Sequence, residues 1–302
     1  MLVSKNIICV QSELGGPVGG AALGPRALLN EIVNEVDFNI VKCINTDCLP
    51  IRKSAFKNAH YLNEINDCLE DISNSVFEYY STTDQKLTVL AGDHSTACGS
   101  LAGLKRAFPT QKIGVIWIDA HADIHSPYTT PSGNVHGMPV SAAIGLDHLN
   151  KKINNLDKAE ESAWLRTKEI CRQSVKCEDL VYIGIRDLEE QEWDIIKENN
   201  ILYYTPKDMD ELGAKKIASS VIDHLNKCDV VYLSFDIDSM DKSLVPGTGT
   251  PVELGLKFAE TSNLLKTFIN LEKTKLVEIV EINPLLDNKN ETAKLIKKLI
   301  IE

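Results

Sequence analysis

The 302-residue sequence lacks the patterns that would assign it at once to several protein classes. Its eight cysteines form no C-x-x-C pair, which excludes a zinc ribbon or a thioredoxin-type motif, so we expect mostly buried, reduced thiols. No apolar run approaches the roughly 18 residues that a membrane helix needs. Residues 1–10 also lack the regions of a secretory signal peptide. These absences predict a cytoplasmic protein with no membrane partner.

The sequence is also short of positive charge. It has 32 lysines and arginines against 43 aspartates and glutamates, a formal net charge of −11. A nucleic-acid-binding protein needs a basic surface, so nucleic acid is not an expected partner, whereas a small cationic substrate is compatible with this charge. Glycines cluster at positions 15–24 and 247–255 but form no G-x-G-x-x-G after a strand, so no dinucleotide site is predicted.

Short apolar runs alternate with amphipathic stretches along the chain. The runs are continuously hydrophobic, which is typical of parallel strands buried on both faces; they cover residues 6–10, 87–91, 113–118, 180–185, 201–204, 230–235 and 276–282. Helical spacing covers residues 26–36, 61–80, 190–199, 213–226, 257–270 and 291–301. The alternation predicts an α/β fold of three layers, with helices on both sides of a mostly parallel sheet.

The length leaves the number of domains open between one and two. The polar stretch at 147–178 is the candidate linker, but it contains four residues with the character of buried anchors, Ala163, Trp164, Leu165 and Ile170. We interpret the stretch as an excursion on the surface of one domain.

Acidic residues and histidines follow three of the predicted strands. The segments are Gly92-Asp93-His94-Ser95, Asp119-Ala120-His121-Ala122-Asp123-Ile124-His125 and Asp236-Ile237-Asp238-Ser239-Met240-Asp241. Because ligands bind beyond the carboxyl ends of the strands in an open parallel sheet, the three segments should meet at one edge. In an extended chain, Asp119, His121 and Asp123 would point to one side, and so would Asp236 and Asp238.

Four aspartates gathered at one place carry a charge of about −4, which requires cations because like charges raise one another's pKa. Two divalent metals would neutralise them, and mixed imidazole and carboxylate ligands suit manganese, cobalt or zinc. A lone aspartate after a strand is more often a helix cap or a turn former, and Asp93 and Asp241 could be such supporting groups. His121-x-x-x-His125 lacks the glutamate of H-E-x-x-H, and residues 236–241 lack the glycine of an EF-hand loop.

These segments resemble the ureohydrolases, the arginase and agmatinase family of binuclear manganese enzymes. The resemblance extends over nearly the whole chain, from Gly19-Gly20 to Pro246-Gly247-Thr248-Gly249-Thr250-Pro251 and Glu281-Ile282-Asn283-Pro284. Residues 132–140 and 182–187 are most similar to the arginase branch. The resemblance implies one arginase-like domain, residues 1–302, since a boundary at 147–178 would divide the ligands between two domains. It also implies a homo-oligomer, a trimer or a hexamer.

The resemblance further implies two Mn²⁺ ions per subunit, with Co²⁺ or another divalent metal as the alternative. The implied ligands are His94, Asp119, His121, Asp123, Asp236 and Asp238, with Asp119 and Asp236 bridging the two ions. A hydroxide held between the ions would attack the guanidinium carbon of L-arginine and give L-ornithine and urea.

Three residues would carry the chemistry around the metals. Asp123 would orient the hydroxide, and His136 would pass a proton to the leaving amine, since an imidazole titrates near neutral pH. Glu281 would bind the guanidinium, whose forked donors favour a carboxylate. The spacing along the last strand puts Glu278 and Glu281 on opposite faces, and Glu281 lies nearer the carboxyl end.

The expected substrate contacts are His125, Ser132, Glu189, Thr250 and Glu281. Ser132 and His125 would face the α-carboxylate of arginine, and Glu189 would face the α-amino group. Arginases usually have asparagine in place of His125 and aspartate in place of Glu189. Lys242 stands where a proline is usual, which predicts a looser loop at 241–246.

Three other functions stay open. Agmatine or another guanidino compound would need the same metal chemistry, but agmatine would leave Ser132 and His125 without a carboxylate to bind. A catalytically silent relative that only binds metal would have lost a ligand, His136 or Glu281, and none is lost. A deacetylase on a related fold would use one metal and a catalytic tyrosine, which the second set of histidine-containing ligands argues against.

Overall fold

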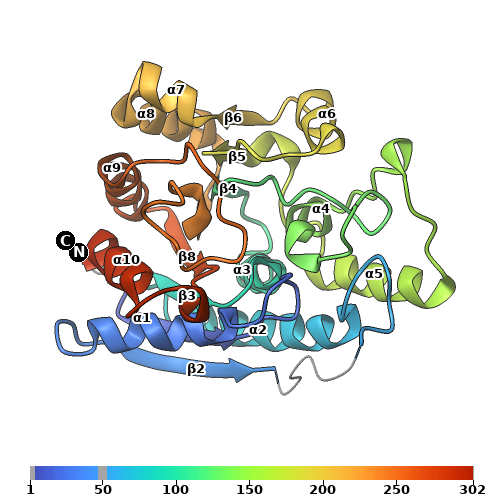
Figure 1. Cartoon of the computed structure of the whole chain (residues 1–302), viewed down its shortest axis with the longest axis horizontal. Coiled ribbons are helices and arrows are strands. Elements are labelled where there is room, and N and C mark those ends of the chain that lie inside the picture. Colours follow the sequence, from blue (N-terminus) through green and yellow to red (C-terminus); the bar gives the residue numbers. More distant parts are fainter. Residues whose placement is uncertain (1–3, 47–52, 302) are drawn as a thin grey trace.

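The computed structural model describes residues 4–46 and 53–301 of the chain (Figure 1). Within these ranges, eight parallel strands form one sheet. They are β1 (Asn6–Gln11), β2 (Asn39–Asn45), β3 (Leu87–Ala91), β4 (Ile113–Ile118), β5 (Leu180–Ile183), β6 (Leu202–Tyr204), β7 (Val230–Asp236) and β8 (Thr274–Val280). The prediction of an α/β fold with a mostly parallel sheet is confirmed.

The strand order decides which of the segments that follow the strands lie next to each other. The order is β2-β1-β3-β8-β7-β4-β5-β6, so that β3, β8, β7 and β4 are consecutive neighbours in the middle of the sheet. Each of these four strands leads into one of the acidic or histidine-containing segments, beginning at Gly92, Glu281, Asp236 and Asp119. Segments far apart in the sequence are therefore placed side by side at one edge of the sheet.

Helices cover both faces of the sheet (Figure 1). One face packs against α2 (Leu62–Thr82), α3 (Ala97–Ala107), α4 (Pro139–Ile144), α5 (Lys158–Cys171) and α6 (Glu190–Glu198). The other packs against α1 (Gly24–Ile32), α7 (Pro206–Leu212), α8 (Ala214–His224), α9 (Phe258–Ile269) and α10 (Glu291–Ile301). Successive strand residues alternate between the two cores, as Ile116 and Trp117 do, which explains the continuous hydrophobic runs in the sequence.

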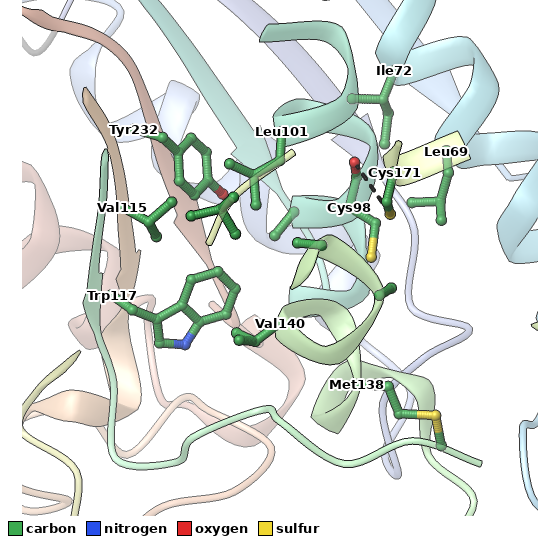
Figure 2. Close-up of a cluster of buried hydrophobic side chains, with 14 of the residues drawn as sticks. Leu69, Ile72, Cys98, Leu101, Val115, Trp117, Met138, Val140, Cys171 and Tyr232 are labelled. Atoms are coloured by element: carbon green, nitrogen blue, oxygen red, sulfur yellow. Dashed lines mark hydrogen bonds between the residues drawn. The ribbon is translucent and has the colours of Figure 1, made fainter. Parts of the chain in front are cut away.

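Two elements that the sequence does not predict have clear physical reasons. β2 is an edge strand with mostly exposed side chains, so it has no hydrophobic run. α3 contains two glycines, which weaken the helical signal, but the glycines let it approach α2 closely. A Cβ on Gly99 would lie 2.7 Å from Cβ of Ile72, and a Cβ on Gly103 would lie 2.6 Å from Cβ of Val76. The glycines of α3 are therefore a packing requirement (Figure 2 shows this core).

The polar stretch at 147–178 contains α5, whose buried residues dock it on α2, α3 and α4. Trp164 is 1% exposed and its indole N–H donates to Asp147 at 2.7 Å. Ala163 is buried and Ile170 is partly buried, as expected, but Leu165 is 53% exposed because it lies on the outer face of α5. The prediction that Leu165 is an anchor is therefore wrong.

The cysteines agree with the expectation of mostly buried, reduced thiols where they are described. Cys9, Cys68, Cys98, Cys171 and Cys228 are buried free thiols, whereas Cys43 is exposed and Cys177 is partly exposed; Cys48 lies outside the described residues. Over residues 4–46 and 53–301, no helix combines the length and hydrophobicity needed to cross a membrane.

Candidate active site

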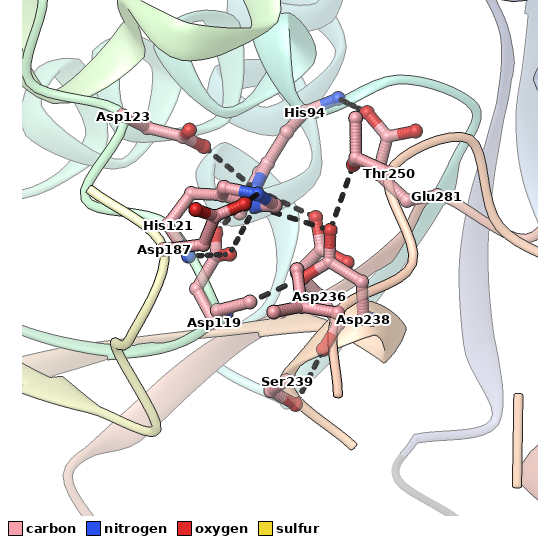
Figure 3. Close-up of polar contacts among 12 residues, drawn as sticks. His94, Asp119, His121, Asp123, Asp187, Asp236, Asp238, Ser239, Thr250 and Glu281 are labelled. Carbon is pink, nitrogen blue, oxygen red and sulfur yellow. Dashed lines mark hydrogen bonds and ion pairs between the residues drawn. The ribbon is translucent and has the colours of Figure 1, made fainter. Parts of the chain in front are cut away.

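His94 lies at the centre of the cluster at the carboxyl edge of the sheet (Figure 3). It follows β3 and begins a short 3-10 turn, His94–Thr96, in which the backbone N–H of Ser95 donates to the side-chain Oδ1 of Asp93 at 3.0 Å. Its ring Nδ1 lies 3.1 Å from Asp119 Oδ2, 3.0 Å from Asp123 Oδ2 and 3.2 Å from Asp236 Oδ2. Three carboxylates from two further strands thus converge on one imidazole nitrogen.

A second group lies beside the first and shares Asp119. His121 Nδ1 is 3.5 Å from Asp119 Oδ1 and 3.2 Å from Asp238 Oδ2. Asp119, His121 and Asp238 each have one ligand atom within 4.8 Å of the others, as do His94, Asp119 and Asp236 in the first group. The geometry therefore offers two adjacent positions for cations with one carboxylate between them.

The atoms of this cluster fit divalent metals. Among the described residues, the buried Nδ1 of His94 has no hydrogen-bond partner, although three carboxylates surround it. Burial raises the pKa of Asp236 well above its ordinary value, with Asp238 and Asp119 adding to the effect, and burial with Asp119 nearby raises the pKa of Asp123 to about 6. Buried acids facing an imidazole lone pair are the donor set that a borderline metal ion satisfies.

The local backbone differs from the extended conformation expected for these segments. β4 ends at Ile118, and Asp123 has φ of 50°, in the left-handed region, so Asp119 and Asp123 are brought together by a turn. Asp236 is the last residue of β7, and Asp238 lies in a 3-10 turn whose N–H donates to Asp236 Oδ1 at 2.8 Å. The predicted convergence is present, although the segments turn where the strands end, so the side chains meet without the extended backbone that was assumed for their common direction.

Two neighbours of the cluster have no assigned role in the sequence-based interpretation. Trp117 stacks on the ring of His94 at 4.2 Å, and its indole N–H donates to Asp119 Oδ2 at 2.9 Å. Ser234 lies 2.7 Å from Nε2 of His94 and leaves Nδ1 for a metal. Each lies in a predicted strand two residues before an aspartate, Trp117 before Asp119 and Ser234 before Asp236. Residues two apart in a strand point to the same face, and this spacing is the signal that could have identified them.

Glu281 and His136 lie next to the cluster of aspartates and histidines around His94. Glu281 follows β8 with φ of 67°, and its Oε1 accepts the backbone N–H of His94 at 2.9 Å and lies 3.2 Å from His136 Nδ1. Burial opposes the charged form of His136, but Glu281 outweighs it and raises the pKa of His136. Glu278 points elsewhere, because it is buried against Thr96 and Tyr232. The two glutamates are separated as the spacing predicted.

A pocket opens from the cluster toward solvent. It is lined by His121, Asp123, His125, Thr130, Pro131, Ser132, Asn134, His136, Gly137, Glu189, Glu192 and Thr250. His125 Nε2 lies 3.2 Å from Glu189 Oε2, and this contact is the main cause that lowers the pKa of Glu189 to about 2. Glu192 was not predicted to line the site. It is buried beside Glu189 as its partner in the capping box of α6, and burial raises its pKa.

Thr250 and Lys242 show how the glycine-rich loop is held. The hydroxyl of Thr250 donates to Asp238 Oδ2 at 2.9 Å, so Thr250 contacts a residue of the second group. The backbone N–H of Lys242 donates to Val252 O at 3.1 Å, and its ammonium pairs with Glu253. The segment around Lys242 is therefore held by contacts that a proline at this position would not supply.

Known proteins share both the sequence and the fold. The family profile described as "Arginase family" matches residues 6–302. The arginase of Bacillus subtilis (strain 168) is 33% identical over 301 residues, which is 98% of this chain and 95% of that protein. The chain belongs to the arginase family. It is accordingly a metal-dependent ureohydrolase, as the motifs predicted.

Solved structures of arginases agree over almost the full length. The native arginase of Bacillus caldovelox has a TM-score of 0.83 at 30% identity, covering 98% of each chain. The Entamoeba histolytica arginase in complex with L-ornithine has a TM-score of 0.83 at 27% identity, again covering 98% of each chain. The arginase-like fold of this chain, with helices on both faces of a parallel sheet, is therefore confirmed.

Proposed function

We propose that this protein is a binuclear manganese enzyme that hydrolyses L-arginine to L-ornithine and urea. The observation that carries the proposal is the position of Glu281, whose Oε1 is 3.2 Å from His136 and 2.9 Å from the backbone nitrogen of His94. A carboxylate suited to a guanidinium, a histidine suited to proton transfer and a metal ligand are thus in contact. The arginase family and the arginases similar to this chain support the same chemistry.

The proposed metal ligands are His94, Asp119, His121, Asp123, Asp236 and Asp238. We propose Mn²⁺ at both positions, with Co²⁺ or another divalent ion as the alternative. When bound, the two ions would supply hydroxide near neutral pH, because divalent cations lower the pKa of water from about 16 toward 7. The family and the two groups of ligands support a metal-dependent site, and the ion itself is part of the proposal.

The side chains around the ligands would do the rest of the work. Glu281 would bind the planar guanidinium through paired N–H donors and orient its carbon toward the ligand cluster, and Thr250 would contact its edge. Asp123 would accept a hydrogen bond from the attacking water or hydroxide. His136 would donate a proton to the leaving amine, and its contact with Glu281 through Nδ1 leaves Nε2 for that transfer.

The outer part of the pocket would bind the amino-acid end of arginine. Ser132 and His125 would contact the α-carboxylate, and Glu189 would contact the α-ammonium group. One observation favours agmatine, which has no carboxylate, as a second candidate substrate. His125 Nε2 lies 3.2 Å from Glu189 Oε2. An N–H that donates to this glutamate is not available to bind a substrate carboxylate.

The remaining parts of the proposal rest on the sequence and the family resemblance. We propose that residues 1–302 act as one domain in the cytoplasm, and that the protein assembles as a homo-oligomer, a trimer or hexamer.

A substrate panel tests the proposed reaction. Urea release is measured with L-arginine and with agmatine, after the protein has been loaded with Mn²⁺ or with Co²⁺, and metal content per chain is determined on the same samples. Turnover of arginine with two bound ions is the expected result. Efficient turnover of agmatine with none of arginine would replace arginine by the second candidate, and a chain that binds no metal would refute the proposed centre.

A further inference from the structure

Arg186 forms hydrogen bonds with several backbone segments around the second group, Asp119, His121 and Asp238. It lies just beyond β5, next to β4 in the sheet, and its own backbone N–H donates to Ala120 O at 2.8 Å. That bond ties the residue after β5 to the segment that carries Asp119 and His121. The guanidinium then reaches the segments that carry Asp238 and Thr250.

The guanidinium makes six hydrogen bonds, and every acceptor is a backbone carbonyl oxygen. The acceptors are Gly184 at 3.1 Å, Asp238 at 2.9 Å, Ser239 at 3.2 Å, Met240 at 3.2 Å, Val252 at 3.0 Å and Glu253 at 2.8 Å. The five N–H groups of the planar fork serve these six acceptors because Nη2 shares its two hydrogens among three carbonyls, whereas a lysine ammonium offers only three donors from one point. The site therefore uses the shape of the arginine side chain.

Two of the bonded segments act on the same ligand. Asp238 supplies one carbonyl, and its neighbours Ser239 and Met240 supply the next two, so the guanidinium holds the backbone of the turn that carries the Asp238 carboxylate. Val252 and Glu253 follow Thr250, whose hydroxyl donates to Asp238 Oδ2 at 2.9 Å. One side chain thus constrains both the backbone of Asp238 and the loop that orients its carboxylate.

We propose that Arg186 is a positioning residue that preforms the second metal position, Asp119–His121–Asp238, through its fork of donors to backbone carbonyls. The proposal rests on the proposed metal centre but not on the choice of substrate. Arg186 makes no bond to the segment of His94 or to the carboxylates of the first group. Its loss should therefore weaken one of the two metal positions and spare the other.

The test is a titration of the metal-free full-length protein with Mn²⁺, followed by calorimetry and by electron paramagnetic resonance. In Arg186→Met and Arg186→Lys, one ion should bind as in the wild type and the other about 10- to 100-fold more weakly, the usual effect of removing a group that orients a metal ligand. The spin-coupled signal of a manganese pair should give way to the signal of isolated Mn²⁺ at two equivalents. Saturating Mn²⁺ should restore kcat of Arg186→Lys toward the wild-type value.

Arg166→Met is the matched control, because it removes the same charge from a surface arginine that pairs with Asp67 and Glu70. It should bind both ions as the wild type does. Thermal unfolding of the metal-free proteins checks that each variant is folded, and if Arg186→Met does not fold, Arg186→Lys decides the question.

Four results would overturn the proposal. The first is wild-type affinity for both ions in Arg186→Lys, which would mean that charge matters and the fork does not. The second is equal weakening of both ions, and the third is kcat that saturating Mn²⁺ does not restore, since each indicates general damage. The fourth, a wild type that binds only one ion, would also refute the proposed metal centre. A wild type that binds two ions but releases no urea would refute the proposed reaction alone and leave this test valid.

Discussion

His148 provides a prediction of how stability depends on pH. The residue lies after α4 with φ of 53°, is 8% exposed, and places Nε2 2.9 Å from the hydroxyl of Ser141. That hydroxyl donates to Ile124 O, so the neutral imidazole donates its N–H to the serine oxygen. Burial, with His125 nearby, lowers the pKa of His148 from 6.5 to about 4. The folded protein therefore keeps this histidine neutral at a pH where the unfolded chain protonates it.

The size of the effect follows from the difference between the two pKa values. Above pH 6.5 neither state binds the proton, and His148 adds no pH dependence. Between 6.5 and 4 only the unfolded state binds it, so the free energy of unfolding falls as the pH falls. With about 1.4 kcal/mol per pKa unit, the loss is about 2 kcal/mol at pH 5 and about 3 kcal/mol below pH 4.

The assay compares denaturant unfolding of the metal-free wild type and His148→Asn at pH 7.5 and pH 5. Asparagine tolerates the left-handed backbone and cannot titrate. The loss of unfolding free energy in His148→Asn relative to the wild type should therefore be smaller at pH 5 than at pH 7.5 by about 2 kcal/mol. Leu149→Ala changes an exposed neighbour and is the control. It should change the free energy of unfolding by the same amount at both pH values. A His148→Asn protein with the same loss of stability on acidification as the wild type would refute the reasoning.

Three further predictions concern the site and the backbone around it. Trp117→Phe should keep an aromatic ring over His94 but lose the indole N–H that donates to Asp119. Calorimetry should then show Mn²⁺ binding weakened about 10-fold. Unchanged affinity would show that the indole N–H does not contribute to metal binding. His136→Asn should keep both ions and lower kcat, most strongly at neutral pH, whereas loss of metal would show that the proposed proton-transfer role is wrong. Leu254→Asn should raise the free energy of unfolding by about 0.5–1 kcal/mol, because Leu254 is 80% exposed with φ of 57°; no gain in chemical denaturation would contradict this strain.

The cluster of aspartates and histidines at the ends of the strands could be predicted from the sequence because its signals are local. A hydrophobic run followed by Asp119-Ala120-His121-Ala122-Asp123 identifies a strand and its polar end without knowledge of the neighbours. The conformation between the ligands could not be predicted in this way. Asp123 turns into the left-handed region and reaches His94, which requires contacts from β3 that are distant in the sequence.

Two of the elements that the sequence did not predict, α3 and β2, depend on their partners for stability. α3 has glycines where a helix is weakened, and only the close approach of α2 explains them. β2 has one buried side chain and is held by backbone pairing with β1. Their residues have ordinary local preferences, so the pattern alone contains little information about them.

The sequence by itself determined the residue types of the site, its expected position at the ends of the strands and the family to which the chain belongs. These follow from short motifs and from hydrophobic runs, which are properties of neighbouring residues. Only the tertiary structure decided which groups touch: His125 contacts Glu189, Glu281 bridges His94 and His136, and the guanidinium of Arg186 donates to the backbone carbonyl of Asp238. Those contacts join strands that are separated in sequence, and the strand order that brings them together is set by packing of the whole sheet.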